Sequence, residues 1–337
     1  KNPLDFLCIP QKRVERVASL LTSGTLCSPK RIFFSEKDIL STRKFFGVGM
    51  QFMVKKGDRT VIFLSGQGEN GVADILKKAL SDIGVDAEIF GSVSDIASAE
   101  KAAANADCLV GMPGEMLRFC RKSPLLRPKT LLLAADYIPM AVCRALKEAW
   151  KCEVFSNFGM TEAGMGCAVD CRFHKELHLR MADLFFEIID PISGKPLPIG
   201  DMGELVITTL RREAMPLIRY RTGDMAALHS GCTGCKSEIL TLKAVYGRCE
   251  DYALGDFSGA FGMHALEELL FAKPEITDFV AKKSEEGIFL ELEADSSIDM
   301  DKLKFQLEYA FPKEKPFFVK IPEKFVSQTG KRKILNI

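Results

Sequence analysis

The sequence predicts an α/β fold: a large domain with a parallel sheet flanked by helices and a β-rich lobe, followed by a small α+β domain. Up to about residue 155, short apolar runs alternate with helical patterns, which is typical of a parallel sheet covered by helices. From Cys167 to Tyr246 apolar runs are separated by turns, and after Gly262 helix and strand patterns mix. At roughly 150 residues per domain, the length suggests two domains. We expect them to span 1–248 and 249–337, with the β-rich lobe at about 167–246.

The first part of the chain should supply the strands and helices of the parallel sheet. Apolar runs of four to seven residues predict strands at Lys30–Phe34, Thr60–Ser65, Val85–Phe90, Asp107–Gly111, Lys129–Ala135 and Cys152–Phe155. Apolar residues repeating every three or four positions predict helices at Glu36–Phe52, Val72–Ile83, Val93–Asn105, Gly114–Lys122 and Pro139–Trp150.

The rest of the chain is predicted to contain a β-rich lobe and a small α+β domain. In the β-rich lobe we expect strands at Leu177–Ile189, Glu204–Leu210 and Ile239–Val245. The small domain is predicted to contain helix Met263–Phe271, strands Ile276–Lys282 and Gly287–Glu293, helix Met300–Phe311 and strand Phe317–Ile321.

Charge and cysteine content exclude several classes of protein. Lys and Arg number 46 against 45 Asp and Glu, without a basic block, which argues against nucleic-acid and anionic-membrane binding. No apolar stretch approaches the roughly 18 residues of a membrane helix, and no signal peptide is visible. The 11 cysteines are too few for a disulfide scaffold. We therefore expect a cytoplasmic enzyme with reduced thiols.

One glycine-rich loop has the spacing of a dinucleotide fingerprint. Gly66-Gln-Gly-Glu-Asn-Gly71 follows an expected strand and opens a helix, so an NAD(P)-binding oxidoreductase is one alternative. That class needs an acidic residue ending the next strand, whereas Glu88 lies inside it. A tight turn that packs helix against strand is the simpler interpretation.

A second loop, Thr22–Lys30, offers hydroxyls, backbone N–H groups and a lysine that can surround phosphate oxygens. Four further motifs follow it in order: Asn157-Phe-Gly-Met-Thr-Glu162, Tyr220-Arg-Thr-Gly-Asp224, Gly247-Arg-Cys-Glu-Asp251 and Thr329-Gly-Lys331. Together they resemble the ordered motifs of the adenylate-forming (acyl-CoA synthetase and luciferase) superfamily. The stretch 203–224 is similar nearly residue for residue to the phenylacetate-CoA ligase branch. Family members usually carry a further N-terminal segment, and since the chain opens at Lys1 rather than Met, we expect part of it to be missing.

The resemblance implies an acid-thiol ligase. A carboxylic acid reacts with ATP and Mg²⁺ to form an acyl-adenylate and pyrophosphate, and a thiol, commonly coenzyme A, then displaces AMP. Two variants stay open: an enzyme of the acyl-protein synthetase type with another acceptor, and a nucleotide-binding protein with degraded catalysis. The second is suggested by Leu26-Cys27, where the family usually has Thr-Gly. A homodimer is one option for the oligomeric state.

The resemblance also implies roles for individual residues. The phosphates would be contacted by Thr22, Ser23, Gly24, Thr25 and Lys30, and adenine by Ala134, Ala135, Asp136 and Phe158. Gly159 is a further cofactor-binding candidate. Thr161 would contact the α-phosphate and Glu162 would hold Mg²⁺. Asp224, helped by Arg248, would bind the ribose hydroxyls. Lys331, or Lys333 in its place, would approach the carboxylate and α-phosphate, and Glu250 would be the hinge of a mobile C-terminal domain.

Cysteine and histidine spacing predicts a metal site. Cys171 and His178, together with Cys232 and Cys235, form a Cys₃His set of the kind that holds structural zinc. His174 or Cys167 could replace one ligand, and unpaired reduced thiols are the alternative interpretation. Some phenylacetate-type ligases resemble this arrangement.

The loop 66–71 also suggests a hypothesis about the substrate. In phenylacetate-type ligases the corresponding turn lines the acid pocket and is richer in aromatic residues, whereas here it offers Gln67, Glu69 and Asn70. The acid would then be smaller or more polar than phenylacetate.

Overall fold

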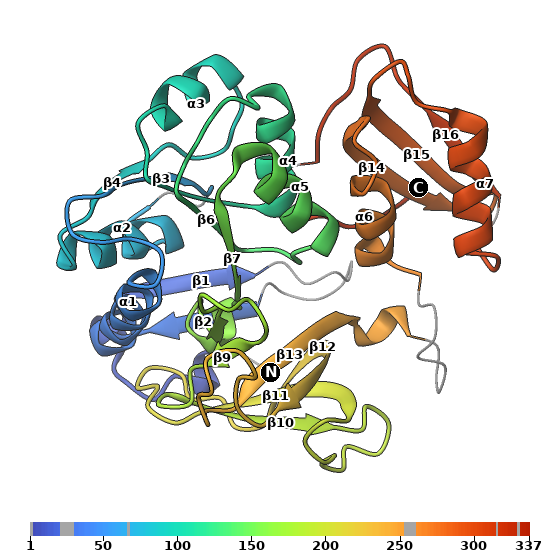
Figure 1. Ribbon diagram of the computed structural model, residues 1–337. Coiled ribbons are helices and arrows are strands. Elements are labelled where there is room, and N and C mark those ends of the chain that lie inside the picture. Colours follow the sequence, from blue (N-terminus) through green and yellow to red (C-terminus); the bar gives the residue numbers. More distant parts are fainter. Residues whose placement is uncertain (1–2, 21–29, 66–67, 253–260, 315, 329–330) are drawn as a thin grey trace.

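The computed structural model describes residues 3–20, 30–65, 68–252, 261–314, 316–328 and 331–337 (Figure 1). Its main feature is a mixed sheet of 11 strands in the order β10-β11-β12-β13-β9-β8-β7-β6-β5-β3-β4. Within the described residues, no helix is long and apolar enough to cross a membrane. The mixed α/β fold predicted from the sequence is confirmed.

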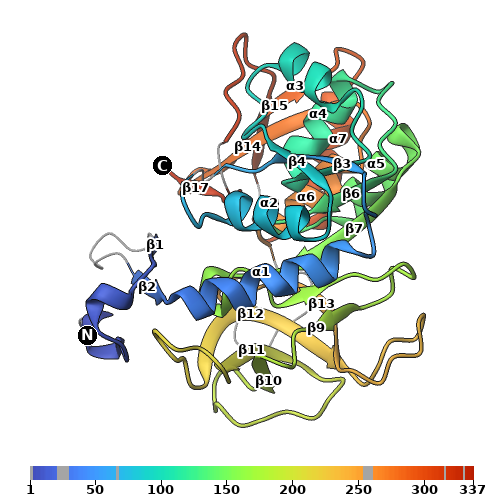
Figure 2. The ribbon, with the colours of Figure 1, turned by 90° about the vertical axis from the view of Figure 1, so that its left-hand side faces the viewer.

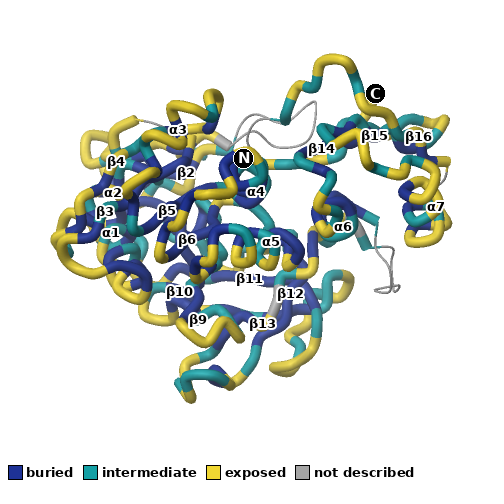
Figure 3. Tube along the Cα trace, turned by 45° about the horizontal axis from the view of Figure 1, so that its top comes forward, coloured by how far each residue is buried: buried dark blue, intermediate teal, exposed yellow. Residues whose placement is uncertain are grey.

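Five parallel strands form one half of this sheet: β3 (Arg59–Phe63), β4 (Asp86–Ile89), β5 (Cys108–Gly111), β6 (Thr130–Leu133) and β7 (Glu153–Phe158). Helices α1 (Glu36–Met50) and α2 (Val72–Asp82) cover one face, and α3 (Ile96–Ala103), α4 (Pro113–Lys122) and α5 (Met140–Trp150) cover the other. Side chains alternate along β3, so that Val61 and Phe63 pack with α3–α5 while Ile62 packs with α1 and α2. Burial on both faces explains why the inner strands β3, β5 and β6 are nearly continuous apolar runs (Figure 3).

The β-rich lobe continues from β7 with antiparallel strands. These are β8 (Ala168–Val169), β9 (Leu177–Leu179), β10 (Leu184–Ile189), β11 (Met202–Thr209), β12 (Tyr220–His229) and β13 (Thr241–Arg248). Helix α1 lies between the parallel sheet and this lobe (Figure 2). The prediction of one strand over Leu177–Ile189 was wrong, because a turn stabilised by the Arg180–Asp183 ion pair separates β9 from β10.

One predicted strand lies in a different sheet. Strand β2 (Lys30–Phe34) was expected to begin the parallel sheet, but it pairs antiparallel with β1 (Arg16–Leu20) in a separate two-stranded sheet. Its side chains Ile32 and Phe34 enter an apolar cluster with Met215 instead of the central sheet's core. The alternation of strands and helices in the sequence predicts that this segment is a strand, but it does not show which strand it pairs with.

The C-terminal part forms a four-stranded sheet in the order β16-β15-β14-β17. Its strands are β14 (Ile276–Ser284), β15 (Gly287–Ala294), β16 (Phe317–Lys320) and β17 (Leu335–Asn336), and its helices are α6 (Met263–Phe271) and α7 (Met300–Ala310). Leu266 and Phe271 of α6 belong to the same buried apolar cluster as Phe119 of α4 and Trp150 of α5. The small sheet is thereby docked on the α4–α5 side of the large one (Figure 1).

Candidate active site

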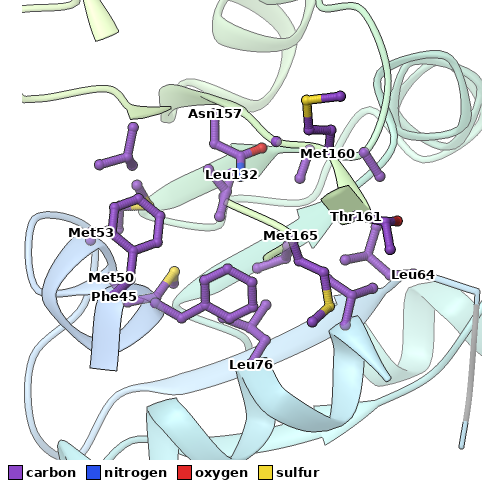
Figure 4. A pocket seen from close by; sticks show the side chains of 18 of the residues that line it. Phe45, Met50, Met53, Leu64, Leu76, Leu132, Asn157, Met160, Thr161 and Met165 are labelled. Carbon is purple, nitrogen blue, oxygen red and sulfur yellow. The ribbon is translucent and has the colours of Figure 1, made fainter. Parts of the chain in front are cut away.

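A cavity of about 170 Å³ lies where the parallel strands end, between the sheet and helices α1 and α2. Ligands of open α/β sheets bind at this edge. Its walls carry mostly hydrocarbon and thioether groups (Figure 4). The polar side chains that line it are those of Asn157, Thr161 and Lys331. Lys331 comes from the C-terminal part of the chain, so the cavity is completed by the docked small sheet.

A tight loop after β7 positions Thr161 and Glu162. A Cβ atom on Gly159 would lie 2.4 Å from the carbonyl oxygen of Met165, so only glycine allows the loop to close this tightly. The N–H groups of Ala163 and Met165 both donate to the carbonyl of Met160, at 3.1 and 2.9 Å. As a result Thr161 lines the cavity, while Glu162 is buried beside it.

Glu162 belongs to a group of three polar side chains. Its Oε1 accepts hydrogen bonds from the hydroxyl of Tyr220, at 2.8 Å, and from Nζ of Lys30, at 3.3 Å. Lys30 also donates to the Tyr220 hydroxyl. Burial lowers the pKa of Lys30, but its bonds to Tyr220 and Glu162 outweigh this and the pKa is raised overall. Lys30 is therefore charged and is held at the edge of the site.

Asp224 and Arg248 face each other on β12 and β13. Nη1 of Arg248 donates to Oδ1 of Asp224 at 2.7 Å and to the carbonyl of Thr222 at 3.1 Å. Burial raises the pKa of Asp224, and the positive charges of Arg248 and Lys331 oppose this shift. Asp224 is thus a mostly buried hydrogen-bond acceptor, and it is close enough to Lys331 for the lysine charge to lower its pKa.

The segment that carries Lys331 is anchored by its neighbour Arg332. The main-chain N–H of Arg332 donates to Oδ2 of Asp136 at 2.9 Å. The guanidinium, in a side chain only 7% exposed, pairs with Glu267 of α6 and Asp278 of β14. Burial raises the pKa of Asp136 and raises that of Glu267 well above its usual value. One arginine therefore joins the C-terminal domain to the loop after β6.

Two further contacts fasten α6 to the start of α5. The rings of His264 and Tyr137 stack with centroids 3.8 Å apart. Glu268 accepts hydrogen bonds from the hydroxyl of Tyr137 and from the N–H groups of Met140 and Ala141. A carboxylate at a helix N-terminus is stabilised by the helix dipole. Burial, with the charges of Arg248 and Lys331, lowers the pKa of His264 to about 4.

Five of the candidate residues line the cavity: Ala134, Ala135, Gly159, Thr161 and Lys331. Glu162 directly follows Thr161 and is bonded to Lys30. Asp224, which pairs with Arg248, is close enough to Lys331 for their charges to interact. Phe158 packs against the core of the β-rich lobe, and Asp136 binds Arg332.

The other candidates lie elsewhere. Lys333 is exposed, its main-chain N–H donates to Gln328, and it does not line the cavity as Lys331 does. Glu250 lies in the short 3₁₀ helix Cys249–Asp251 that follows β13. Thr22, Ser23, Gly24 and Thr25, as well as Gln67, fall outside the described residues.

Sequence reasoning missed Tyr220, Asn157 and Arg332. Each lies within or beside a motif that had been singled out, but nothing in the spacing showed what its side chain would contact. The position of Tyr220 at the start of the Tyr-Arg-Thr-Gly-Asp motif was the one available signal.

The four predicted metal ligands meet at one point in the β-rich lobe. The ligand atoms of Cys171, His178, Cys232 and Cys235 all lie within 4.8 Å of one another. Sγ of Cys171 is 4.0 Å from Sγ of Cys232, and Sγ of Cys235 is 3.5 Å from Nε2 of His178. Bonds of about 2.3 Å to sulfur and about 2.0 Å to nitrogen in a tetrahedron give such ligand separations.

The alternative ligands are engaged elsewhere. Nδ1 of His174 lies 2.6 Å from Oδ2 of Asp170, and Cys167 is fully buried in the core of the lobe. The Cys-x₂-Cys turn is held in place by Glu176, which accepts hydrogen bonds from the N–H and hydroxyl of Thr233. The donor set and its shape therefore suit zinc.

Comparison with known proteins supplies the class. No family model matches the chain. The phenylacetate-coenzyme A ligase of Thermus thermophilus is 32% identical over 148 residues, a match that covers 43% of this chain and 33% of that protein. The phenylacetate-coenzyme A ligase of Escherichia coli K12 is 33% identical over 115 residues, covering 34% and 26%. The matched part of the chain thus spans no more than about a third of the length of these relatives.

Solved structures match over nearly the whole chain. 2-Hydroxyisobutyryl-CoA ligase in its postadenylation state matches with a TM-score of 0.82 at 15% identity, covering 99% of this chain and 76% of that one. The anthranilate CoA ligase AuaEII matches with a TM-score of 0.64 at 16% identity, covering 94% and 66%. The fold is therefore that of the adenylate-forming CoA ligases. Within that class the chain is homologous to the phenylacetate-CoA ligases over the matched segment, which confirms the predicted resemblance.

The oxidoreductase alternative loses its remaining support. Glu88 lies inside β4, and its carboxylate pairs with Arg59 of the neighbouring strand β3. It does not end the strand as an acidic residue that binds ribose would.

Proposed function

We propose that this protein activates a carboxylic acid with ATP and Mg²⁺ and transfers the acyl group to the thiol of coenzyme A. One observation carries the proposal: Lys331 of the C-terminal domain and Thr161 of the loop after β7 line the same apolar cavity. A cation and a hydroxyl in the wall of an apolar pocket suit an acid whose body is buried and whose carboxylate reacts beside these two groups.

In the first step a carboxylate oxygen forms a bond to the α-phosphorus of ATP, and the bond from that phosphorus to pyrophosphate breaks. Lys331 places a positive charge where negative charge develops on the carboxylate and phosphate oxygens. Thr161 offers its hydroxyl to the α-phosphate, and Asp224 accepts hydrogen bonds from the ribose hydroxyls. Lys30 adds positive charge beside Glu162.

Glu162 fits the role of a magnesium ligand because it has a carboxylate, the type of ligand that Mg²⁺ prefers, and directly follows Thr161 of the cavity wall. Bound Mg²⁺ would neutralise charge on the phosphates. Tyr220 and Lys30 fix the orientation of the carboxylate through its Oε1 atom.

In the second step the sulfur of coenzyme A bonds to the acyl carbon and AMP leaves, which requires Lys331 to withdraw. We propose that the domain 249–337 rotates about the segment near Glu250. The chain matches 2-hydroxyisobutyryl-CoA ligase with a TM-score of 0.82 in its postadenylation state but 0.65 in its thioesterification state. The present arrangement is more similar to the first than to the second, which supports the proposal.

We further propose one structural zinc ion bound by Cys171, His178, Cys232 and Cys235. It would tie the segment between β8 and β9 to the turn between β12 and β13. Because four protein ligands close the coordination shell, the ion would serve stability and not catalysis. A cytoplasmic location and a homodimeric state stay predictions from the sequence.

Carboxylate-dependent exchange of pyrophosphate into ATP tests the proposal. We expect exchange with at least one acid in a panel, and thioester formation when coenzyme A is added. Exchange without thioester formation would indicate another acceptor, and no exchange with any acid would overturn the assignment as a ligase.

A further inference from the structure

The apolar cavity contains one buried polar atom without a partner. Oδ1 of Asn157 is shielded from solvent, and no donor among the described residues reaches it. Asn157 is the next-to-last residue of β7 and lines the cavity among hydrocarbon and thioether groups. A buried acceptor that has no hydrogen bond costs free energy. A ligand that brings a donor to this atom therefore gains binding energy there.

The Asn157 side chain faces the cavity because of strand alternation. The preceding residue, Ser156, hydrogen-bonds with Cys143 of α5 on the opposite face of the sheet. In the view of Figure 4, Asn157 lies between Thr161 and Met53. The amide thus borders the space that the body of a bound acid would occupy.

The remaining walls suit a single aromatic ring. Phe45 and Phe46 come from α1, and the cavity is also lined by the thioethers of Met50, Met53, Met160 and Met165. Aromatic edges and sulfur atoms both make favourable contacts with a ring. A cavity of about 150 Å³ holds benzene, so the 170 Å³ found here admits one substituted ring.

Within the loop 66–71, the described polar residues Glu69 and Asn70 do not contribute to these walls. Glu69 is exposed, and the side chain of Asn70 accepts a hydrogen bond from Lys78. Neither residue lines the cavity. Apart from Thr161 and Lys331, which we assign to the carboxylate, the polar side chain among the described lining residues is that of Asn157.

We propose that the substrate is a single-ring aromatic acid with a hydroxyl or amino substituent that donates a hydrogen bond to Oδ1 of Asn157. This proposal rests on the proposed function and adds the substrate class. The carboxylate lies at the Thr161 and Lys331 end, the ring lies against Phe45 and the methionines, and the substituent meets the amide. A hydroxyl satisfies the amide in either orientation, because it both donates and accepts.

Matched pairs of acids test the proposal in the pyrophosphate exchange assay. Phenylacetate would be compared with its 2-, 3- and 4-hydroxy and amino derivatives, and benzoate with the corresponding series. We expect one substituted isomer to exceed its unsubstituted parent in kcat/KM by about tenfold to a hundredfold, the effect of one buried hydrogen bond. Equal or better use of the unsubstituted parents would overturn the substrate class and leave the ligase activity standing.

A variant then assigns the preference to one side chain. Asn157→Leu keeps the volume and removes the amide, so the preferred isomer should lose its advantage while the parent acid is used as well or better. Ser156→Ala, on the opposite face of the same strand, is the matched control and should keep the preference. A raised KM for ATP with an unchanged acid preference would overturn the inference, since the amide would then serve the nucleotide. Absence of exchange with every acid is the distinct result that removes the proposed function and this inference with it.

Discussion

The main-chain N–H of Arg332 donates a hydrogen bond to Oδ2 of Asp136 over 2.9 Å, although the two residues are 196 positions apart. The bond connects the last segment of the chain to the loop after β6, whose neighbours Ala134 and Ala135 line the cavity. Arg332 directly follows Lys331. This hydrogen bond and the ion pairs with Glu267 and Asp278 therefore fix the position of the Lys331 main chain. The contacts that dock the C-terminal domain therefore also place Lys331 at the cavity.

The first prediction concerns this anchor. Arg332→Ala leaves Glu267 and Asp278 buried without their cation, a change that costs roughly 3–5 kcal/mol when one partner of a buried pair is removed. We expect the adenylation half-reaction to fall by at least about tenfold. Transfer from preformed acyl-adenylate to coenzyme A should fall much less, because it uses a different arrangement of the domains. Lys333→Ala is the control, and equal losses in both half-reactions would refute the positioning role of Arg332.

The second prediction concerns Tyr220, whose hydroxyl donates to Glu162. Tyr220→Phe removes this bond and keeps the ring, at a cost of about 1 kcal/mol. Because Glu162 is then less well oriented, the Mg²⁺ concentration for half-maximal exchange should rise about fivefold. A Mg²⁺ titration of exchange rates measures this. An unchanged midpoint would show that Tyr220 does not orient the metal ligand.

The third prediction concerns the four-ligand cluster. Purified protein that has not met a chelator should contain one zinc ion per chain by elemental analysis. Cys235→Ser should lose most of the metal and lower the unfolding temperature, whereas Cys8→Ser, an exposed cysteine outside the cluster, should change neither. Wild-type protein without zinc, or a Cys235→Ser variant with a full complement of metal, would contradict the site.

The fourth prediction concerns pH. The folded-state pKa of His264, about 4, lies below the ordinary histidine value of 6.5, so the folded state favours the neutral ring. As pH falls below 6.5, the unfolded state takes up a proton at His264 more readily than the folded state does. The free energy of unfolding therefore decreases between pH 6.5 and pH 4. The ring stacks on Tyr137, and the positive charges of Arg248 and Lys331 are near enough to lower its pKa. Between pH 7 and pH 5 the loss from this group should be roughly 2 kcal/mol.

His264→Phe supplies the comparison, because it keeps a ring against Tyr137 and removes the titrating group. Its free energy of unfolding, measured in urea, should fall less than that of the wild type between pH 7 and pH 5. Parallel pH dependences of the two proteins would show that His264 does not carry the effect.

Much of the fold could be predicted from local patterns. Helix α6 was predicted with its exact bounds, Met263–Phe271, because Gly262 precedes a clear apolar repeat. Strand β2 was assigned to the wrong sheet because its pairing with β1 depends on a non-local choice of partner. The break between β9 and β10 was missed because Arg180 and Asp183 make a turn through side chains inside an apolar run.

In the site, too, local sequence patterns could be read from the sequence, whereas contacts between distant segments could not. The Cys171, His178, Cys232 and Cys235 set could be found because metal ligands follow recognisable spacings. The role of Arg332 could not, because its partners lie on α6, β14 and the loop after β6 and meet only when the domains dock. Asn157 was overlooked within its own motif, since only the cavity shows that its amide lacks a partner.

The central claim is that Lys331 acts in adenylation from a domain that then moves away. Its most direct test measures both half-reactions in Lys331→Ala, with Lys333→Ala as the matched control. We expect acid-dependent pyrophosphate exchange to fall by about a hundredfold or more, because a charge aimed at the developing transition state is lost, while preformed acyl-adenylate still transfers to coenzyme A at close to the wild-type rate. Exchange at the wild-type rate in Lys331→Ala would contradict the account.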